Sequence, residues 1–119
     1  MNVKAKSISI VLTGFTVALL LGAAAAPEGR RIEITAKRFA FDPDEITLKK
    51  GVPVVLVFHS EDVTHGIKFK ELHLQGDIPK GKTVELPFTP ETTGTFEGKC
   101  SRFCGMGHGR MKLDIKVTD

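Results

Sequence analysis

The sequence predicts an all-β domain, either a Greek-key sandwich or a small barrel, built from seven to eight short strands. Turn-forming residues, mostly Gly, Pro and Asp, recur about every eight to twelve residues in the C-terminal two thirds of the chain. No apolar repeat of about 3.6 residues survives between these turns. Apolar and polar residues alternate there instead, which is the pattern of strands with one buried face.

Several segments carry this strand pattern. The alternation is clearest in four of them, Ile32–Ala36, Ile46–Leu48, Val84–Phe88 and Leu113–Val117. The run Val54–Phe58 is apolar at every position, which predicts a central strand covered on both faces. We also expect a strand at Thr95–Lys99 and a final strand that starts near Met111.

The first 26 residues have the composition of an export signal. Lys4 and Lys6 precede an uncharged apolar run, and the tract ends in small residues through Ala26, as in a cleaved signal peptide. An uncleaved anchor is the alternative, because residues 8–26 carry no charge and approach the ~20 residues needed to span a bilayer. We therefore expect a domain of residues 27–119 in the periplasm or another extracytoplasmic space, with possible membrane attachment through the N-terminal segment.

The charge of the chain argues against one class of partner. The 119 residues include 17 Lys and Arg against 14 Asp and Glu, and two of the positive charges, Lys4 and Lys6, belong to the N-terminal segment. No basic cluster is denser than the pairs Lys37-Arg38 and Lys49-Lys50. A nearly neutral domain without a basic patch predicts no nucleic-acid partner.

Residues 100–111, which we call the ligand loop, hold an unusual density of metal-binding side chains. Both cysteines of the chain, one histidine and two of the three methionines lie here, together with three glycines. Thiolate, thioether and imidazole groups are the ligands of soft metals, and their mixture favours copper over zinc. The glycines allow the backbone to fold these side chains around one point. The loop therefore predicts a copper site.

A disulfide is the alternative for Cys100 and Cys104, because exported proteins usually pair their cysteines. A bridge between residues four apart closes a very short loop and adds little stability in the chain-entropy model. His108 and Met111 follow Cys104 at four and seven residues, a clustered spacing typical of metal sites. We favour the metal site, with the disulfide as the expected fate of the metal-free protein.

A second imidazole must come from outside the ligand loop, where His59, His65 and His73 are the candidates. His65 is favoured because it follows the central strand in an expected turn, where a loop can reach the end of the sandwich. His59 is expected to be a residue of that strand, and His73 a strand-surface residue. Met106 is interpreted as a hydrophobic lid over the metal, with a spare thioether ligand as the alternative.

The pattern Cys-x-x-x-Cys-Gly-x-x-His-x-x-Met at residues 100–111, preceded by Asp-Val-x-His-Gly at residues 62–66, resembles the copper-A domain of cytochrome c oxidase subunit II. Residues 39–51 resemble the first hairpin of the bacterial members. The resemblance spans nearly all of residues 27–119 and implies a cupredoxin fold with a mixed-valence dinuclear copper centre.

The resemblance also implies a role for each candidate ligand. Two thiolates bridge both copper ions in that family, and each ion takes one histidine and one weak axial ligand. The bridging cysteines and the histidines would be Cys100, Cys104, His65 and His108. Met111 would be the axial ligand of one ion, and the backbone carbonyl of Arg102 that of the other.

This ligand set leaves no coordination position open for a substrate, so we expect an electron-transfer protein rather than an enzyme. The first hypothesis is an exported electron carrier or small oxidase subunit, whose partners would be a c-type cytochrome or a terminal oxidase. A mononuclear copper site with His65, one of the two cysteines, His108 and Met111 is a variant of it. The second hypothesis is a periplasmic copper chaperone or copper buffer that uses the same ligands.

Two departures from the family concern docking. Many members carry Glu at the position of Arg102, where its side chain helps to hold a magnesium ion at the contact with the large catalytic subunit. An Arg side chain cannot take that role. The chain also has no Trp and no Tyr, the residues in which the family's aromatic docking cluster is rich.

Overall fold

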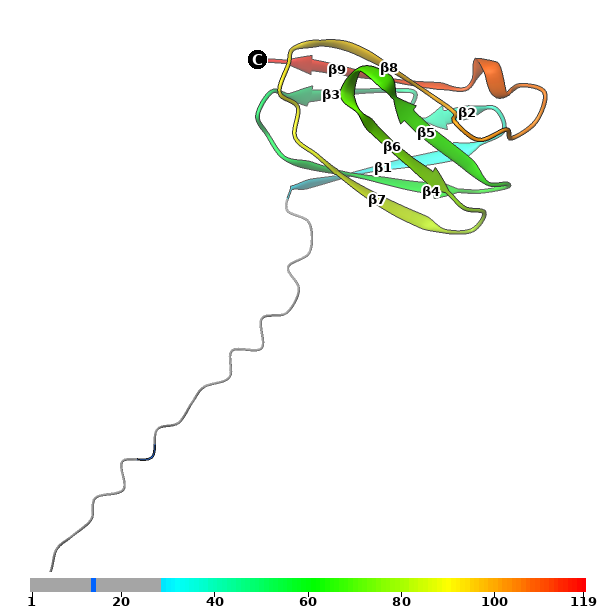
Figure 1. Ribbon diagram of the computed structural model, residues 1–119, viewed down its shortest axis with the longest axis horizontal. Coiled ribbons are helices and arrows are strands. Elements are labelled where there is room, and N and C mark those ends of the chain that lie inside the picture. The colour runs from blue at the N-terminus through cyan, green and yellow to red at the C-terminus, as the bar shows by residue number, and fades with distance from the viewer. Residues whose placement is uncertain (1–13, 15–28) are drawn as a thin grey trace, which may run out of the picture.

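The computed structural model describes Gly14 and residues 29–119. The predicted signal or anchor segment, residues 1–26, lies outside this part of the chain apart from Gly14. Within the described part, no helix is long and apolar enough to cross a membrane. It contains nine strands and two short 3-10 helices (Figure 1). Their bounds are β1 Arg30–Lys37, β2 Ala40–Asp42, β3 Glu45–Lys49, β4 Val54–Ser60, β5 His65–Phe69, η1 Lys70–Leu72, β6 Leu74–Ile78, β7 Thr83–Phe88, β8 Gly94–Lys99, η2 His108–Arg110 and β9 Lys112–Thr118.

The strands form two sheets, which confirms the predicted sandwich. One sheet has the order β2-β1-β4-β7 and the other the order β3-β9-β8-β5-β6. The pairs β1–β4 and β3–β9 are parallel, and the remaining pairs are antiparallel. Parallel neighbours that are distant in the sequence show that the chain crosses between sheets, as a sandwich with crossover connections requires.

The core lies between the two sheets and follows the apolar pattern of the sequence. In β4 the five residues Val54–Phe58 are all buried, as their unbroken apolar run predicts, because β4 lies between β1 and β7. In β9 and β3 the buried positions alternate with exposed ones. Leu113, Ile115 and Leu48 face the core, and burying each such side chain contributes about 1.5–3 kcal/mol to stability.

Six of the nine strands match segments that were located in the sequence, and the other three do not, so the total exceeds the expected seven to eight. β2 has only three residues. β5 and β6 form a hairpin in a region where no regular alternation is visible. In β5 the first three residues, His65 to Ile67, are all buried, because the core covers one face and the ligand loop covers the other at Gly66.

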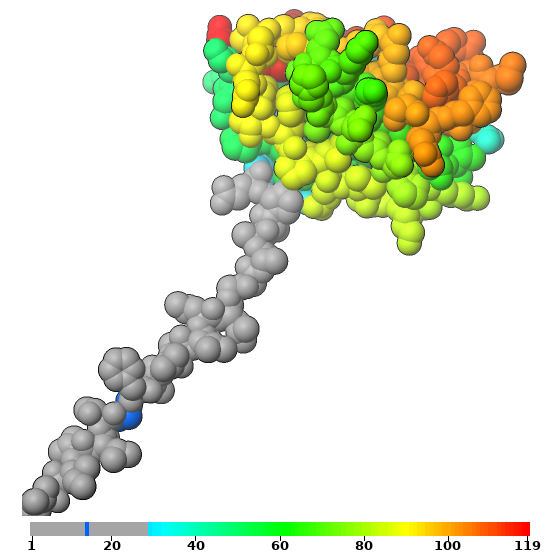
Figure 2. All heavy atoms as spheres, in the orientation of Figure 1, coloured from blue at the N-terminus to red at the C-terminus, as the bar shows by residue number. Residues whose placement is uncertain are grey.

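The ligand loop lies at one end of the sandwich. Figure 1 shows this segment, which contains η2 and is coloured orange, at the end opposite the C-terminus. Figure 2 shows the same segment on the surface of that end. The sandwich therefore presents the candidate metal ligands at one edge of a rigid two-sheet body.

Candidate metal centre

The two ends of the ligand loop are fixed by the sheet. Cys100 directly follows β8 and Met111 directly precedes β9, and the last ladder pair of these strands is Lys99 with Lys112. The backbone N–H of Cys100 donates to the carbonyl of Met111 at 3.1 Å. The first and last side chains of the predicted ligand set are thus placed opposite one another by strand pairing.

The two thiols lie side by side. The Sγ atoms of Cys100 and Cys104 are 3.5 Å apart, and both cysteines are free and buried. This separation is far longer than the S–S bond of a disulfide, about 2.04 Å. The structure therefore presents two free thiols, the arrangement that a metal pair could share.

His65 directs one ring nitrogen at this thiol pair. Its side chain is 0% exposed, and its Nδ1 lies 3.9 Å from Cys100 Sγ. The expectation of a turn at this position was wrong: His65 is the first residue of β5 and pairs with Ile78. The strand fixes the imidazole more firmly than a turn would, because its backbone belongs to the sheet.

The other ring nitrogen of His65 contacts Asp62, whose Oδ1 lies 2.7 Å from Nε2. Partial burial would raise the pKa of Asp62, but hydrogen bonds from the N–H of Arg38, from His65 and from the N–H of Val63 outweigh it and lower the pKa to about 2. An ionised carboxylate can only accept, so Nε2 carries the ring proton. The lone pair of Nδ1 is then free on the side of the thiols, as a metal-binding histidine requires.

The second thiol has its own set of neighbours. Cys104 Sγ lies 3.8 Å from Nδ1 of His108 and 3.8 Å from Sδ of the buried Met111. His108 opens the short helix η2, which turns its ring back toward the cysteine. The thiol of Cys100 meanwhile donates to the carbonyl of Arg102 at 3.1 Å.

The structure thus brings together all six residues singled out from the sequence. Each sulfur has one imidazole nitrogen and one weaker donor beside it, and we call each of these two groups of donors a half-site. The donor atoms of His65 and the two cysteines lie within 4.8 Å of one another. Two thiols, two imidazoles, a thioether and a carbonyl are a set that suits copper.

Burial affects the chemistry of the thiols. It raises the pKa of Cys104, and the contact with the thiol of Cys100 raises it further, to about 11. Both the loss of solvation and the neighbouring sulfur disfavour a thiolate in the metal-free protein. Metal binding must therefore displace a proton from this site, which couples metal uptake to pH.

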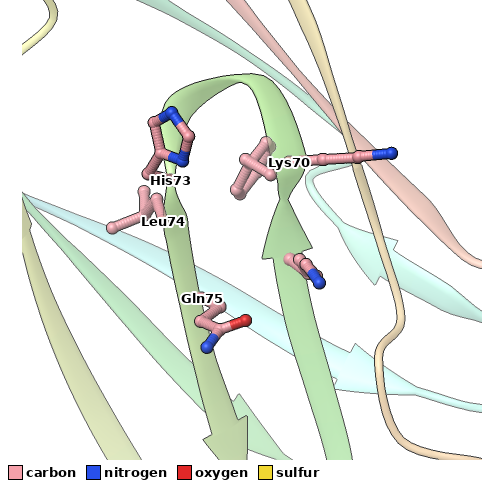
Figure 3. Close-up of a pocket in the computed structure, with 6 residues that line it drawn as sticks. Lys70, His73, Leu74 and Gln75 are labelled. Atoms are coloured by element: carbon pink, nitrogen blue, oxygen red, sulfur yellow. The ribbon is translucent and has the colours of Figure 1, made fainter.

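Other candidates lie away from the centre. His59 is exposed on β4, where its Nδ1 lies 3.3 Å from Thr83 Oγ1. His73 lies at the tip of the β5–β6 hairpin rather than on a strand face, and lines a surface cavity of about 460 Å³ with Lys70, Leu74 and Gln75 (Figure 3). Met106 is 97% exposed, so its interpretation as a lid over the metal was wrong.

Three supporting residues had no role assigned from the sequence. Asp62 was part of the quoted motif, three residues before His65, and that spacing was the available signal. Gly66 is required by close packing, because a Cβ there would overlap Ser101 Oγ and approach the side chain of Arg102 to 2.8 Å. Arg38 donates from Nε to the carbonyl of Cys104 at 3.1 Å, a contact between residues too distant in the sequence to be predicted.

The protein-family model described as the cupredoxin-like domain matches residues 9–112 of the chain. The chain belongs to this family. It is 39% identical over 71 residues to a probable cytochrome c oxidase subunit 2 of Streptomyces avermitilis, an alignment that covers 60% of the chain and 22% of that protein. With cytochrome c oxidase subunit 2 of Thermus thermophilus it shares 25% identity over 93 residues, 78% of the chain and 69% of the relative.

A solved structure gives a third comparison. The metal-binding domain of a Cu(I)-exporting P-type ATPase of Streptococcus pneumoniae, determined with Cu(I), superposes with a TM-score of 0.62 at 27% identity, over 75% of the chain and 85% of that domain. The resemblance to subunit II is thus confirmed at the level of the family. The chain spans about a fifth of the length of the Streptomyces relative. The cupredoxin fold implies copper binding, and a cluster of Cys, His and Met donors is present to provide it.

Proposed function

We propose that this chain carries electrons through a dinuclear copper centre of the copper-A type. The observation that carries the proposal is the pair of free thiols 3.5 Å apart, each with an imidazole nitrogen within 3.9 Å on its own side. A mononuclear site would use one of these thiols and leave the other buried without a role. Two half-sites that share two sulfurs use every donor in the cluster.

The roles in this proposal follow the two half-sites. Cys100 and Cys104 would bridge the two ions, with His65 and His108 as one ligand of each ion. Met111 and the carbonyl of Arg102 would complete the set as weak axial ligands. When bound, such a centre supplies reversible one-electron transfer.

The protein contributes rigidity around this centre. The strand pair β8–β9 fixes the ends of the ligand loop, and the sheet fixes the backbone of His65. A scaffold that resists movement keeps the ligands in nearly the same place in both redox states. Small rearrangement lowers the barrier to electron transfer, so stiffness here serves function directly.

The location and partners are part of the proposal. Residues 1–26 would act as an export signal or anchor, and residues 27–119 would work in the periplasm or an equivalent space. The ring of Phe103, 77% exposed, lies beside that of His108, with centroids 5.8 Å apart and the planes tilted by 48°. This exposed edge is where we expect a c-type cytochrome or a terminal oxidase to exchange electrons, with the chain acting as a carrier or a small oxidase subunit.

A second candidate function is copper delivery or buffering. The likeness to the metal-binding domain of a Cu(I)-exporting ATPase, determined with Cu(I), favours it. The soft sulfur donors of the cluster also suit Cu(I). The two functions differ in how firmly the metal must be held, since a carrier retains its copper and a delivery protein releases it.

Metal analysis combined with voltammetry tests the proposal. The chain loaded with copper under reducing conditions should hold two ions, show a reversible one-electron wave and keep its copper against a competing Cu(I) chelator. One copper per chain with a single intense thiolate band would establish a mononuclear site instead. Rapid loss of copper to the chelator without a reversible wave would favour delivery.

A further inference from the structure

We propose that Arg38 is a positioning residue that fastens the two ligand-bearing segments of the metal centre to each other. The proposal rests on the copper site described above, but its basis is a set of contacts present in the protein itself. Arg38 lies in the turn between β1 and β2, on neither of the segments that carry ligands. Its backbone contacts one segment and its side chain contacts the other.

The backbone contact acts on His65. The N–H of Arg38 donates to Oδ2 of Asp62 at 2.8 Å, while Oδ1 of the same carboxylate lies 2.7 Å from Nε2 of His65. A further hydrogen bond, from the N–H of Val63 to Oδ1 at 2.7 Å, holds the carboxylate on its own loop. The two oxygens of Asp62 therefore connect the β1–β2 turn to the orientation of the imidazole.

The side-chain contact acts on the ligand loop. Nε of Arg38 donates to the carbonyl oxygen of Cys104 at 3.1 Å. The sulfur of Cys104 faces both His108 and Met111, so this peptide group orients the residue at the centre of the second half-site. Hydrogen bonds from a charged donor are stronger than neutral ones.

Packing beside Arg38 supports the same role. The ring of Phe39 lies against the ligand loop, where a Cβ at Gly105 would be 2.9 Å from the ring and a Cβ at Gly107 would overlap it. Gly105 also has a φ of 135°, which side chains rarely adopt. The loop thus has no side chain at the two positions where the turn approaches it.

The positive charge of Arg38 should also affect the reduction potential of the centre. The ion pairs formed among residues 29–119 do not include its guanidinium. Arg38 is exposed, but its Nε reaches the carbonyl of Cys104, and a positive charge at that place stabilises the centre more when the centre holds the extra electron. Arg38 should therefore raise the reduction potential as well as hold the loop.

Thiol trapping in the metal-free protein tests the fastening. In the reduced full-length chain without copper, Arg38→Ala should increase the rate at which the buried thiols react with an alkylating reagent by about tenfold, because a charged hydrogen bond that keeps the loop closed is lost. Arg38→Lys keeps the charge but not the planar Nε donor and should react at an intermediate rate. Arg110→Ala, which removes an equal charge from an exposed position on the same loop, is the matched control and should react like the wild type.

Copper-loaded protein supplies readouts that a merely structural role would not change. Arg38→Ala should release copper about tenfold faster, the lower end of the usual effect for partners of metal ligands, and its reduction potential should fall. Arg110→Ala should change both far less. Equal potentials and equal release rates for Arg38→Ala and the wild type would overturn the proposal, as would equal thiol trapping.

A double-mutant cycle tests whether Arg38 links the two segments. Asp62→Asn weakens the contact to the His65 side, and Arg38→Ala removes the contact to the ligand loop. Their effects on thiol trapping should be non-additive if one connection runs through both residues, and additivity would contradict the link.

Since thiol trapping needs no metal, the test of Arg38 is independent of the proposed function. Wild-type protein that fails to bind two coppers would refute the proposed function, while the test of Arg38 would still give an answer. If Arg38→Ala does not fold, Arg38→Lys carries the same comparison.

Discussion

The two segments that supply the metal centre are held in different ways. His65 belongs to β5, which pairs with β6 over five residues. The ligand loop, residues 100–111, has no strand pairing inside it; its backbone bonds are a few turn contacts, and contacts with Gly66 and Arg38 hold it from outside. The strand-borne half of the centre is therefore fixed by regular structure, whereas the loop-borne half is fixed by individual contacts.

Because of this difference, β5 fixes the position of one ligand, whereas the contacts around the ligand loop can change the properties of the centre. A strand residue cannot move without breaking several sheet hydrogen bonds, so His65 is a fixed reference for the centre. The loop carries the remaining donors and depends on glycines that admit close neighbours. We expect substitutions of ligands to abolish the centre, and substitutions of the contacts that support the loop to change its affinity and potential.

The largest effect should come from removing the strand-borne ligand. His65→Ala should leave at most one copper on the ligand loop and destroy the native absorption, because the remaining imidazole of the centre, that of His108, contacts Cys104 and not Cys100. Metal analysis and an absorption spectrum provide the measurement. His59→Ala and His73→Ala are matched controls that should keep the spectrum and cost at most about 1 kcal/mol of stability. A His73 variant without the spectrum, beside a His65 variant that retains it, would reverse the assignment.

Crowding the loop at its contact with β5 should give the next largest effect. Gly66→Ala would place a methyl group against Ser101 and Arg102, displacing the carbonyl of Arg102 and lowering stability by about 1–3 kcal/mol, as overpacking does. Gly109→Ala is the matched control in the same region, since a Cβ there meets nothing within 4 Å. Chemical denaturation measures both variants, and equal stability for the two would show that the loop does not depend on this contact.

The carboxylate that holds His65 should matter less than the histidine. Asp62→Asn should weaken copper binding by about tenfold, because it disturbs the hydrogen bond that fixes the imidazole. Since the folded-state pKa of Asp62 is lowered from 3.8 to about 2, its contribution to stability is present above pH 4 and is lost as the pH falls toward 2. The acid-unfolding curve of the metal-free Asn variant should therefore lack that part of the wild-type pH dependence. Superimposable curves would contradict the role given to this carboxylate.

The smallest effect should come from the weak axial position. Met111→Leu should keep two coppers and shift the reduction potential, since axial ligands adjust a copper site more than they hold it. Leu fills a similar buried volume, so the fold should change little. Voltammetry together with metal analysis provides the test. Loss of both coppers from this variant would show that Met111 is a primary ligand.

The sequence predicted the parts of the structure that leave a local pattern. Alternation along β9 and the unbroken apolar run in β4 gave the correct strands. The core covers one face of each strand, and Val55 and Val57 on the other face of β4 are buried between β1 and β7. β5 left no such pattern, since the core covers one of its faces and a loop from residues about 35 positions away covers the other. For that reason the turn expected at His65 was wrong, although His65 itself does lie in the cluster of candidate metal ligands.

The metal cluster was predictable for a similar reason. Its loop-borne donors, such as Cys104 and His108, are adjacent in the sequence, so their proximity follows from chain connectivity. The supporting contacts of Arg38 and Gly66 depend on packing between distant segments, and neither residue type signals such a role. The exposure of Met106 was also invisible, since an apolar side chain between two glycines can face either inward or outward.

The central claim is that two thiols of one loop hold two copper ions that share a single electron. The most direct measurement is an EPR spectrum of the copper-loaded chain in its oxidised, mixed-valence state. The account predicts hyperfine splitting from one unpaired electron coupled equally to two copper nuclei. A spectrum in which the electron couples to a single copper nucleus, with one copper per chain, would contradict it.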